Sequence, residues 1–136
     1  MYLIYFVGCF IAVLASQNVT SVNQSMLEEM PIWFTFILGV FWAPIVEELL
    51  FRGVIRRFIK NNTVFILTSG IIFGVLHTIL ESNITDVVFL AIPYTILGSF
   101  FAYIYAKTDN LTNNILLHAF HNAVAVLLSC VLAFII

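Results

Sequence analysis

Ionisable side chains stand inside the apolar segments of this sequence, where they could carry out hydrolytic chemistry. An ionised side chain in the middle of a membrane helix costs about 2.5–3.5 kcal/mol on insertion scales. Such groups face a protein interior or a wet cavity and are candidate functional groups by default. All three histidines of the chain belong to this set, which comprises Glu47, Glu48, His77, His118 and His121, with Asn122 beside them.

The spacing of these residues predicts which of them share a helix face. Residues four apart in a helix lie one above the other. Glu48 and Arg52 are so spaced, in the order that favours an ion pair, whereas Glu47 points about 100° away from Glu48. The two glutamates therefore lie on different faces of the helix and must have different roles. His118 and Asn122 are also four apart.

A second segment adds another imidazole to the set. Phe73 and His77 are four apart, so they share a face of their own helix. His121 follows His118 by three residues but faces a different direction, and we expect it to be a bystander. One carboxylate with two or three imidazole or amide groups could therefore converge between helices.

Such a set suits the hydrolysis of a peptide bond. A carboxylate can act as the general base that takes a proton from water. An imidazole N–H and an asparagine amide can donate to a developing oxyanion, and a histidine could also polarise the water or protonate the leaving amine. Structural roles compete with this interpretation: Glu48–Arg52 as an ion pair at a membrane edge, Glu47 as a residue reaching the cytoplasmic surface, and His77, His118 and Asn122 as hydrogen-bonding links between helices.

The composition indicates what kind of elements must position these groups. The chain has 136 residues, of which 62% are apolar and only 9% are charged, and its mean hydropathy is +1.11. Soluble domains carry roughly 25% charged residues. The sequence therefore predicts an integral membrane protein with a single domain over residues 1–136. No basic stripe indicates nucleic-acid binding. Cys9 and Cys130 lie in apolar runs and are expected to be small buried apolar residues.

Five apolar segments approach the roughly 20 residues that a transmembrane helix needs. They predict an all-α fold, a polytopic transmembrane bundle of about five spans. The first segment has the length of a signal-peptide core, but it lacks a basic flank, so we expect a retained helix. Only the connection 17–31 could hold an ordered excursion. The segments are roughly 2–16, 32–51, 64–80, 87–106 and 115–136.

The basic residues predict the orientation in the membrane. Four of the five Lys and Arg residues lie in 52–60, and the fifth is Lys107. The positive-inside rule places both of these connections in the cytoplasm. The connections 17–31 and 81–86 carry acidic residues and no basic ones. Five spans then put the N-terminus inside and the C-terminus outside, and we expect the membrane to be a bacterial cytoplasmic membrane.

The depth of the candidate groups in the membrane is uneven. At 1.5 Å per residue, Glu47 would lie about 6–8 Å inside the cytoplasmic end of its helix, His118 about 5 Å and His77 about 20 Å. Straight helices would not bring His77 to Glu47. Either the helix of 64–80 starts later, or the preceding helix is tilted or broken near Pro44. We expect a water-filled cavity, open to the cytoplasm, beside a kink at Pro44.

At these residues the sequence resembles the CPBP group of membrane proteins. This group joins type II CAAX prenyl endopeptidases with bacteriocin-processing enzymes and is also called the Abi family. It carries EExxxR, FxxxH and HxxxN/D motifs, in that order, on separate membrane helices. Each motif is weak alone, but three in order within membrane segments are specific. The resemblance covers about residues 40–128, with EELLFR at 47–52, FGVLH at 73–77 and HAFHN at 118–122.

The resemblance implies an intramembrane glutamate-type endopeptidase with no cofactor and no metal ligand. By motif, Glu47 would activate the attacking water, and His77 would help to position that water or the scissile peptide. His118 and Asn122 would stabilise the oxyanion. The substrate would carry a membrane-embedded or lipid-associated segment, such as a CAAX-type tail or a leader-bearing bacterial peptide. The supporting residues would be Glu48, Arg52 and Phe73.

Other functions stay open. A metal-dependent membrane protease would use Glu47, His77 and His118 as ligands, although the HExxH zinc signature is absent. A non-enzymatic immunity or scaffold protein would need no catalytic group. Transport would usually require more spans or oligomerisation.

Overall fold

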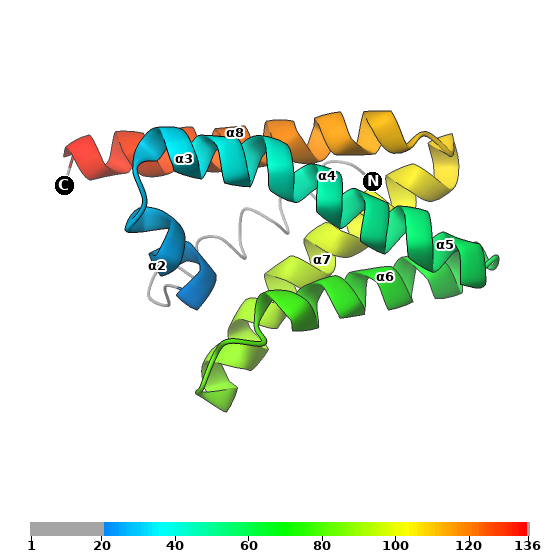
Figure 1. The fold of residues 1–136 in the computed structure, drawn as a ribbon. Helices are drawn as coiled ribbons and strands as arrows, with labels where there is room; N and C mark the ends of the chain where they lie inside the picture. Colours follow the sequence, from blue (N-terminus) through cyan, green and yellow to red (C-terminus); the bar gives the residue numbers. More distant parts are fainter. Residues whose placement is uncertain (1–20, 136) are drawn as a thin grey trace.

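The computed structural model of the protein describes residues 21–135, and this part of the chain is helical with no β-strand (Figure 1). The prediction of an all-α fold is confirmed. The first expected span, at 2–16, lies outside the described residues.

One continuous helical run of 27 residues extends from Ile32 to Phe58 and crosses the upper part of Figure 1. Two π-helical stretches lie within it, and they flank the segment that carries Glu47 and Glu48. The predicted span ended at residue 51, which was too short. Arg52, Arg56 and Arg57 lie in the helix and not in a connection. The successive elements are α3 (Ile32–Phe36), η2 (Ile37–Trp42), α4 (Ala43–Glu48), η3 (Leu49–Val54) and α5 (Ile55–Phe58).

Pro44 does not break this helix. It lies inside the continuous run, near the start of α4, and its side chain is buried. A proline there cannot donate a hydrogen bond to the preceding turn. The irregularity takes the form of η2, directly before α4. Single π-helical turns inside α-helices often occur at functional sites. The expected break at Pro44 is therefore wrong.

The greater length of this helix removes most of the difference in membrane depth that was expected between Glu47 and His77. Measured from Phe58, Glu47 lies about 16 Å along the helix, and His77 lies about 22 Å from Asn62. The remaining difference is small enough for crossed helices to absorb, and Figure 1 shows the helix of His77 running obliquely to α4.

The helices α6 (Asn62–His77) and α7 (Ile84–Thr108) form the most extensive helix pair. Gly70 and Gly74 make the close approach possible. A Cβ on Gly70 would lie only 2.9 Å from the backbone nitrogen of Ser99, so no larger residue fits there. Small residues four apart are a common way for membrane helices to bring their backbones together.

A tight connection follows α7. Asp109 has a left-handed φ of 48°, which ends the helix, and the Asn110 side chain accepts a hydrogen bond from the Asn113 N–H at 3.0 Å. The next helix, α8 (Leu111–Ile135), therefore starts earlier than the predicted segment 115–136. It packs mainly against η2 and α4.

An ordered excursion precedes the long helix, as expected for the connection 17–31. It is the short helix α2 (Val22–Glu28). The Val22 N–H donates to the Glu81 carboxylate at 2.8 Å, and the Thr35 hydroxyl donates to the Leu27 carbonyl at 2.9 Å. The excursion is thus tied to the α6–α7 connection and to α3.

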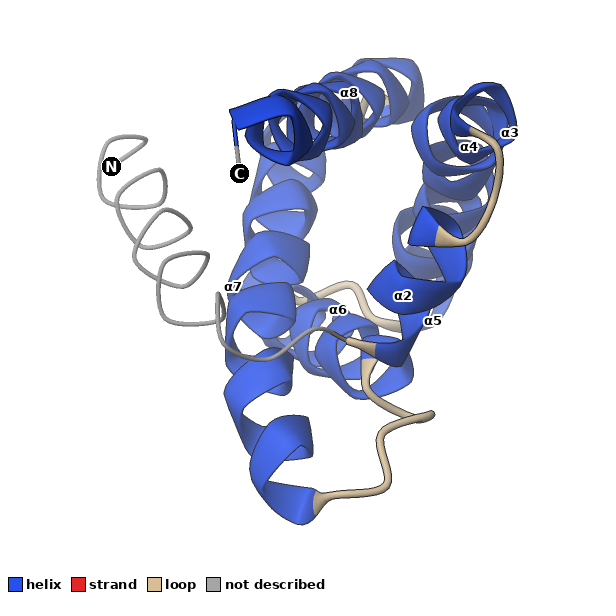
Figure 2. Cartoon of the chain, turned by 90° about the vertical axis from the view of Figure 1, so that its left-hand side faces the viewer, coloured by secondary structure: helices blue, strands red, loops and turns tan. Residues whose placement is uncertain are grey.

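The polarity of the bundle is that of a membrane protein, with a buried ion pair inside and large apolar side chains outside. Glu48 and Arg52 are 0% exposed, whereas Trp33 is 64% exposed and Phe58 is 82% exposed. Figure 2 shows α8 and α3–α4 at the top of the bundle with α6 below them.

Among the described residues, three helices are long and apolar enough to cross a membrane. The helix α6 is a shorter apolar helix, and its 16 residues fall below the roughly 20 needed for a full crossing. These four helices, with the segment 2–16 outside the described part, are consistent with about five spans. The three long ones are Ile32–Phe58, Ile84–Thr108 and Leu111–Val131.

Candidate active site

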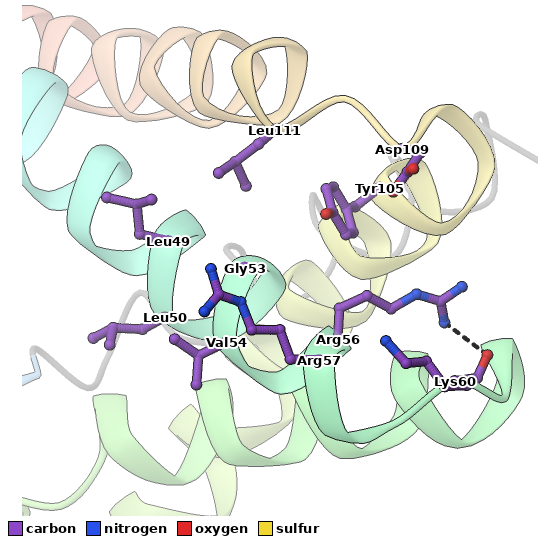
Figure 3. A pocket seen from close by; sticks show the side chains of 10 residues that line it. All are labelled: Leu49, Leu50, Gly53, Val54, Arg56, Arg57, Lys60, Tyr105, Asp109 and Leu111. Carbon is purple, nitrogen blue, oxygen red and sulfur yellow. Dashed lines mark hydrogen bonds between the residues drawn. The ribbon is translucent and has the colours of Figure 1, made fainter.

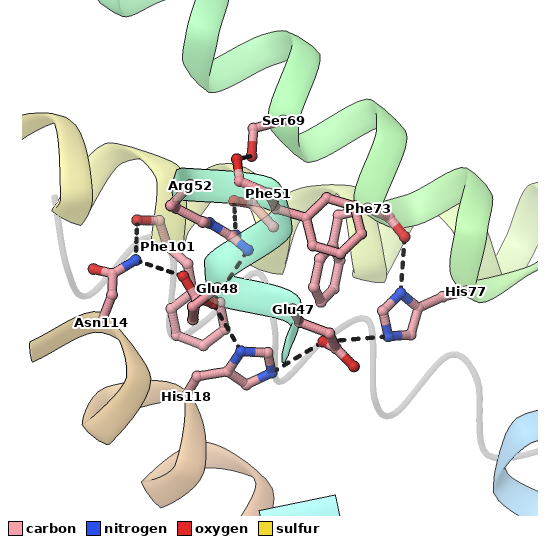
Figure 4. A network of polar contacts seen from close by, with 11 residues as sticks. Glu47, Glu48, Phe51, Arg52, Ser69, Phe73, His77, Phe101, Asn114 and His118 are labelled. Carbon is pink, nitrogen blue, oxygen red and sulfur yellow. Dashed lines mark hydrogen bonds and ion pairs between the residues drawn. The ribbon is translucent and has the colours of Figure 1, made fainter. Parts of the chain in front are cut away.

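Three helical runs bring their polar side chains to one place inside the bundle (Figure 4). The first run supplies Glu47 and Glu48 from α4, and it is followed by Arg52 in η3. His77 comes from the end of α6, and His118 comes from α8. The predicted convergence of these groups is therefore present in the structure.

Glu48 lies at the centre of a buried polar network, and both of its carboxylate oxygens have partners. Its Oε1 lies 3.1 Å from Arg52 Nη1 and 2.8 Å from His118 Nδ1, and its Oε2 accepts from the Asn114 amide at 2.9 Å. A buried carboxylate needs such partners because its desolvation is costly. The expected ion pair with Arg52 is present. The pair is enclosed by protein.

Arg52 is held by a carbonyl and by aromatic rings. Its Nη2 donates to the Gly98 carbonyl at 2.6 Å. Its guanidinium lies 5.3 Å from the ring centre of Phe73, 5.5 Å from that of Phe101 and 5.8 Å from that of Phe51, within the range of cation–π attraction. A buried cation is thereby compensated on several sides.

His118 is oriented by Glu48. A carboxylate only accepts, so the Nδ1 of His118 carries the hydrogen of the 2.8 Å bond. Its ring stacks on Phe101, with ring centres 4.5 Å apart. The opposite nitrogen, Nε2, lies 3.7 Å from Glu47 Oε2. The network thus fixes which nitrogen of His118 faces Glu47.

His77 is oriented in the same sense by its own helix. Its Nδ1 donates to the Phe73 carbonyl at 2.8 Å, and its Nε2 lies 3.9 Å from Glu47 Oε2. Its ring is sandwiched between the rings of Phe73 and Tyr94, with ring centres at 4.2 and 4.5 Å. Phe73 therefore holds His77 through both its carbonyl and its ring, which explains the four-residue spacing.

Glu47 points away from Glu48, as the helix geometry predicts. Its side chain is 22% exposed, and its Oε2 accepts no hydrogen bond from the described residues. The separations of 3.7 and 3.9 Å from the two imidazoles are too long for direct hydrogen bonds. A water oxygen about 2.8 Å from each partner atom would bridge either gap.

Asn122 is not brought into this cluster. Its amide donates to the Gly39 carbonyl in η2 at 2.8 Å, and it thereby links α8 to the long helix. His121 contacts the ring of Phe101 edge-on, with ring centres 6.2 Å apart.

Sequence reasoning missed Asn114. This residue is 0% exposed and donates to both Glu48 and the Phe101 carbonyl, at 2.9 and 2.8 Å. It lies four residues before His118, on the same face of α8. That spacing from His118 could have indicated that Asn114 belongs to the same polar network. The rings of Phe101 and Tyr94, which stack on the two imidazoles, carried no comparable signal.

Glu47, His77 and His118 are the side chains that a metal-dependent protease would use as ligands. Within residues 21–135 there is no group of three or more His, Cys, Asp or Glu side chains arranged to hold a metal ion. Ligand atoms around a tetrahedral zinc lie roughly 3.4 Å apart, since each zinc–ligand distance is about 2.1 Å. The separations between Glu47 and the two imidazoles are longer.

A cavity of about 520 Å³ lies further along the same long helix, between Leu49 and Lys60, with Leu111 on its opposite wall. The expected cavity was placed beside Pro44, whose side chain is buried and does not line this cavity.

Comparison with known proteins identifies the family. A sequence model described as "Type II CAAX prenyl endopeptidase Rce1-like" matches residues 29–124, well over half of the chain. The UPF0177 protein YxdF of Lactococcus lactis is 30% identical over 80% of this chain and 60% of its own length. The UPF0177 protein YbdI of the same organism is 29% identical, over 68% of this chain and 48% of its own length.

A third relative carries an enzymatic name. "Putative membrane peptidase YdiL" of Bacillus subtilis is 28% identical over 83% of this chain and 43% of its own length. The chain thus spans less than two thirds of the length of these relatives. No solved structure gave a significant match. Together with the apolar spans, the family match makes the chain an integral membrane protein that belongs to the Rce1-like family of type II CAAX prenyl endopeptidases.

Proposed function

We propose that this protein is an intramembrane endopeptidase in which Glu47 activates the attacking water. The observation that carries the proposal is the position of Glu47 Oε2, which faces the Nε2 atoms of His118 and His77 at 3.7 and 3.9 Å. The family match and the name of the Bacillus relative support a peptidase.

His77 would orient the water, and His118 would face the substrate oxygen. Both rings have their Nδ1 atoms committed, to Glu48 and to the Phe73 carbonyl, so both direct Nε2 toward Glu47. A water between them would donate one hydrogen to the Glu47 carboxylate and the other to the neutral His77. Its lone pair would then point away from these acceptors, toward a substrate carbonyl carbon.

The reaction follows from this arrangement. The water oxygen bonds to the carbonyl carbon while one of its protons passes to Glu47. Protonated His118, backed by the Glu48 carboxylate, would donate its Nε2–H to the oxyanion. The C–N bond then breaks as Glu47 returns the proton to the leaving amine. For Asn122 to be a second oxyanion donor, its bond to the Gly39 carbonyl must be exchanged for the substrate oxygen.

We further propose that the substrate is a peptide or protein with a membrane-embedded or lipid-associated segment. A CAAX-type tail agrees with the family description, and a leader-bearing peptide would suit bacterial relatives. By the positive-inside rule, the ends near Arg56, Arg57 and Lys107 face the cytoplasm. We propose a bacterial cytoplasmic membrane, with the N-terminus inside and the C-terminus outside if there are five spans.

The test is cleavage of lipidated and leader-bearing peptides by the full chain purified in detergent. Glu47→Gln should reduce cleavage by roughly 100- to 10,000-fold, the usual contribution of a general base. Glu29→Gln is the matched control, because Glu29 is an exposed acid outside the cluster. Equal cleavage by wild type and Glu47→Gln would remove Glu47 from the mechanism.

Two further arms separate the alternatives. Activity that survives chelation supports the glutamate mechanism, whereas loss on chelation with rescue by zinc would favour Glu47, His77 and His118 as metal ligands. A cellular phenotype that is unchanged in Glu47→Gln would favour a non-enzymatic immunity or scaffold role.

A further inference from the structure

The cavity at the basic end of the bundle is separate from the cluster around Glu47, and its walls are of two kinds (Figure 3). One part is apolar and is formed by Leu49, Leu50, Val54 and Leu111. The other part is cationic and is formed by Arg56, Arg57 and Lys60. Of the described residues that line the cavity, Asp109 is the one acid.

Two of the three cations are available to a ligand. Arg56 is occupied, because it donates to the Asn62 side chain at 2.6 Å and to the Lys60 carbonyl at 3.1 Å. The side chains of Arg57 and Lys60 form no ion pair with the described residues, and both residues are exposed. Figure 3 shows the Arg57 guanidinium directed back toward Gly53 and the apolar wall.

The cavity lies near the ends of the long helices. Two long helices end at Phe58 and Thr108, and α8 begins at Leu111. The cavity therefore lies where the spans meet the membrane–water boundary, the level of the lipid phosphates.

The apolar wall faces outward from the bundle. Leu49, Leu50 and Val54 are 48%, 51% and 44% exposed, so hydrocarbon chains of the membrane would cover them. An occupant that satisfies both walls must join a negative group to hydrocarbon.

We propose that this cavity binds the headgroup of an anionic phospholipid. The phosphate lies between Arg57 and Lys60, and the upper acyl chain lies along Leu49, Leu50 and Val54. Basic pockets between membrane helices on the cytoplasmic side suit such headgroups, and guanidinium groups bind phosphate in a planar fork. The proposal is independent of the proposed peptidase activity.

The experiment is a lipid titration of the delipidated full chain in detergent, read by native mass spectrometry. Phosphatidylglycerol and phosphatidylcholine with identical acyl chains are compared, so the two lipids differ only in the headgroup. We expect phosphatidylglycerol to bind with the higher affinity. In the double variant Arg57→Gln/Lys60→Gln, that affinity should fall roughly 30-fold, about fivefold for each charge removed near the surface.

Lys107→Gln is the matched control. Lys107 lies outside the cavity, with its ammonium 5.7 Å from the ring centre of Tyr103, and its removal should leave lipid affinity unchanged. Circular dichroism confirms that each variant keeps its helix content. Inorganic phosphate and a short peptide with a free C-terminal carboxylate serve as competitors.

Three results would overturn the proposal. The first is equal affinity for the two lipids in the wild-type protein, which needs no variant to be folded. The second is unchanged affinity in the folded double variant. The third is displacement of the lipid by inorganic phosphate or by the peptide at equal concentration, which would assign the cavity to a soluble anion or to a peptide end.

Discussion

His118 donates its Nδ1–H to Glu48 Oε1 across 2.8 Å, and this bond joins two residues 70 positions apart in the sequence. It gives Glu48 a second task besides pairing with Arg52. The two adjacent glutamates thus have different roles: Glu48 orients the imidazole of His118, and Glu47 is left to contact water. The predictions below test this division.

Glu48→Gln should lower the stability of the folded protein. The amide leaves Arg52 as an uncompensated buried cation, and breaking a buried pair costs about 3–5 kcal/mol. The measurement is the midpoint of thermal unfolding in detergent. Because the pair acts as a unit, Glu48→Gln/Arg52→Met should be less destabilised than the sum of the single variants. Additive losses would contradict the pairing.

Asn114→Ala should destabilise the protein by about 1–3 kcal/mol, because Glu48 Oε2 and the Phe101 carbonyl lose their buried donor. Asn113→Ala is the control, since Asn113 is the exposed neighbour on the same helix. Chemical unfolding followed by circular dichroism gives the comparison. A similar small loss in both variants would show that the buried amide is dispensable.

Gly98→Ala should be strongly destabilising. A Cβ there would lie 2.7 Å from the Phe73 Cβ, in a place where neither helix backbone can yield easily. Gly39→Ala offers a contrast, because a Cβ on Gly39 meets nothing within 4 Å. Alanine is favoured over glycine in a helix by about 1 kcal/mol, so Gly39→Ala should be neutral or stabilising. The readout is the yield of folded protein and its unfolding midpoint.

Asn122→Ala separates two roles of one amide. As a link to the Gly39 carbonyl, Asn122 should contribute about 1 kcal/mol of stability, with little effect on turnover once the protein is folded. As an oxyanion donor, it should contribute roughly 100- to 1,000-fold to kcat. Steady-state kinetics and thermal unfolding on the same preparation distinguish the two.

His77→Ala should lower kcat with little change in KM, because His77 is proposed to orient the water and not to bind the peptide. Tyr94→Leu removes one of the two rings that stack on His77, so its effect should be in the same direction and smaller. A rise in KM alone for His77→Ala would indicate a role in substrate binding instead.

The fold class and much of the site geometry could be predicted from the sequence. Apolar runs predicted the helices, and the spacing of Glu48 and Arg52 predicted their ion pair, because helix periodicity depends only on neighbours along the chain. The residues of the three motifs, taken with a family resemblance, predicted the convergence of Glu47, His77 and His118.

Other features depend on contacts between distant segments and left little trace in the sequence. The long helix continues through Arg52 because Glu48, the Gly98 carbonyl and three aromatic rings take up the charge, and local hydropathy does not show this. The bond from Asn122 to Gly39 likewise needed the packing of α8 against η2. The burial of Asn114 followed only from the two acceptors around it.

The two π-helical stretches on either side of α4 also have a consequence for sequence change. At each stretch a main-chain carbonyl, of Gly39 or of Phe51, accepts a side-chain donor from another helix, Asn122 or Ser69. A main-chain acceptor persists whatever side chain occupies its position. These two hydrogen bonds therefore survive a change of side chain at position 39 or 51, whereas positions 122 and 69 are held to side chains that can donate. Position 51 is constrained separately, by the buried ring of Phe51.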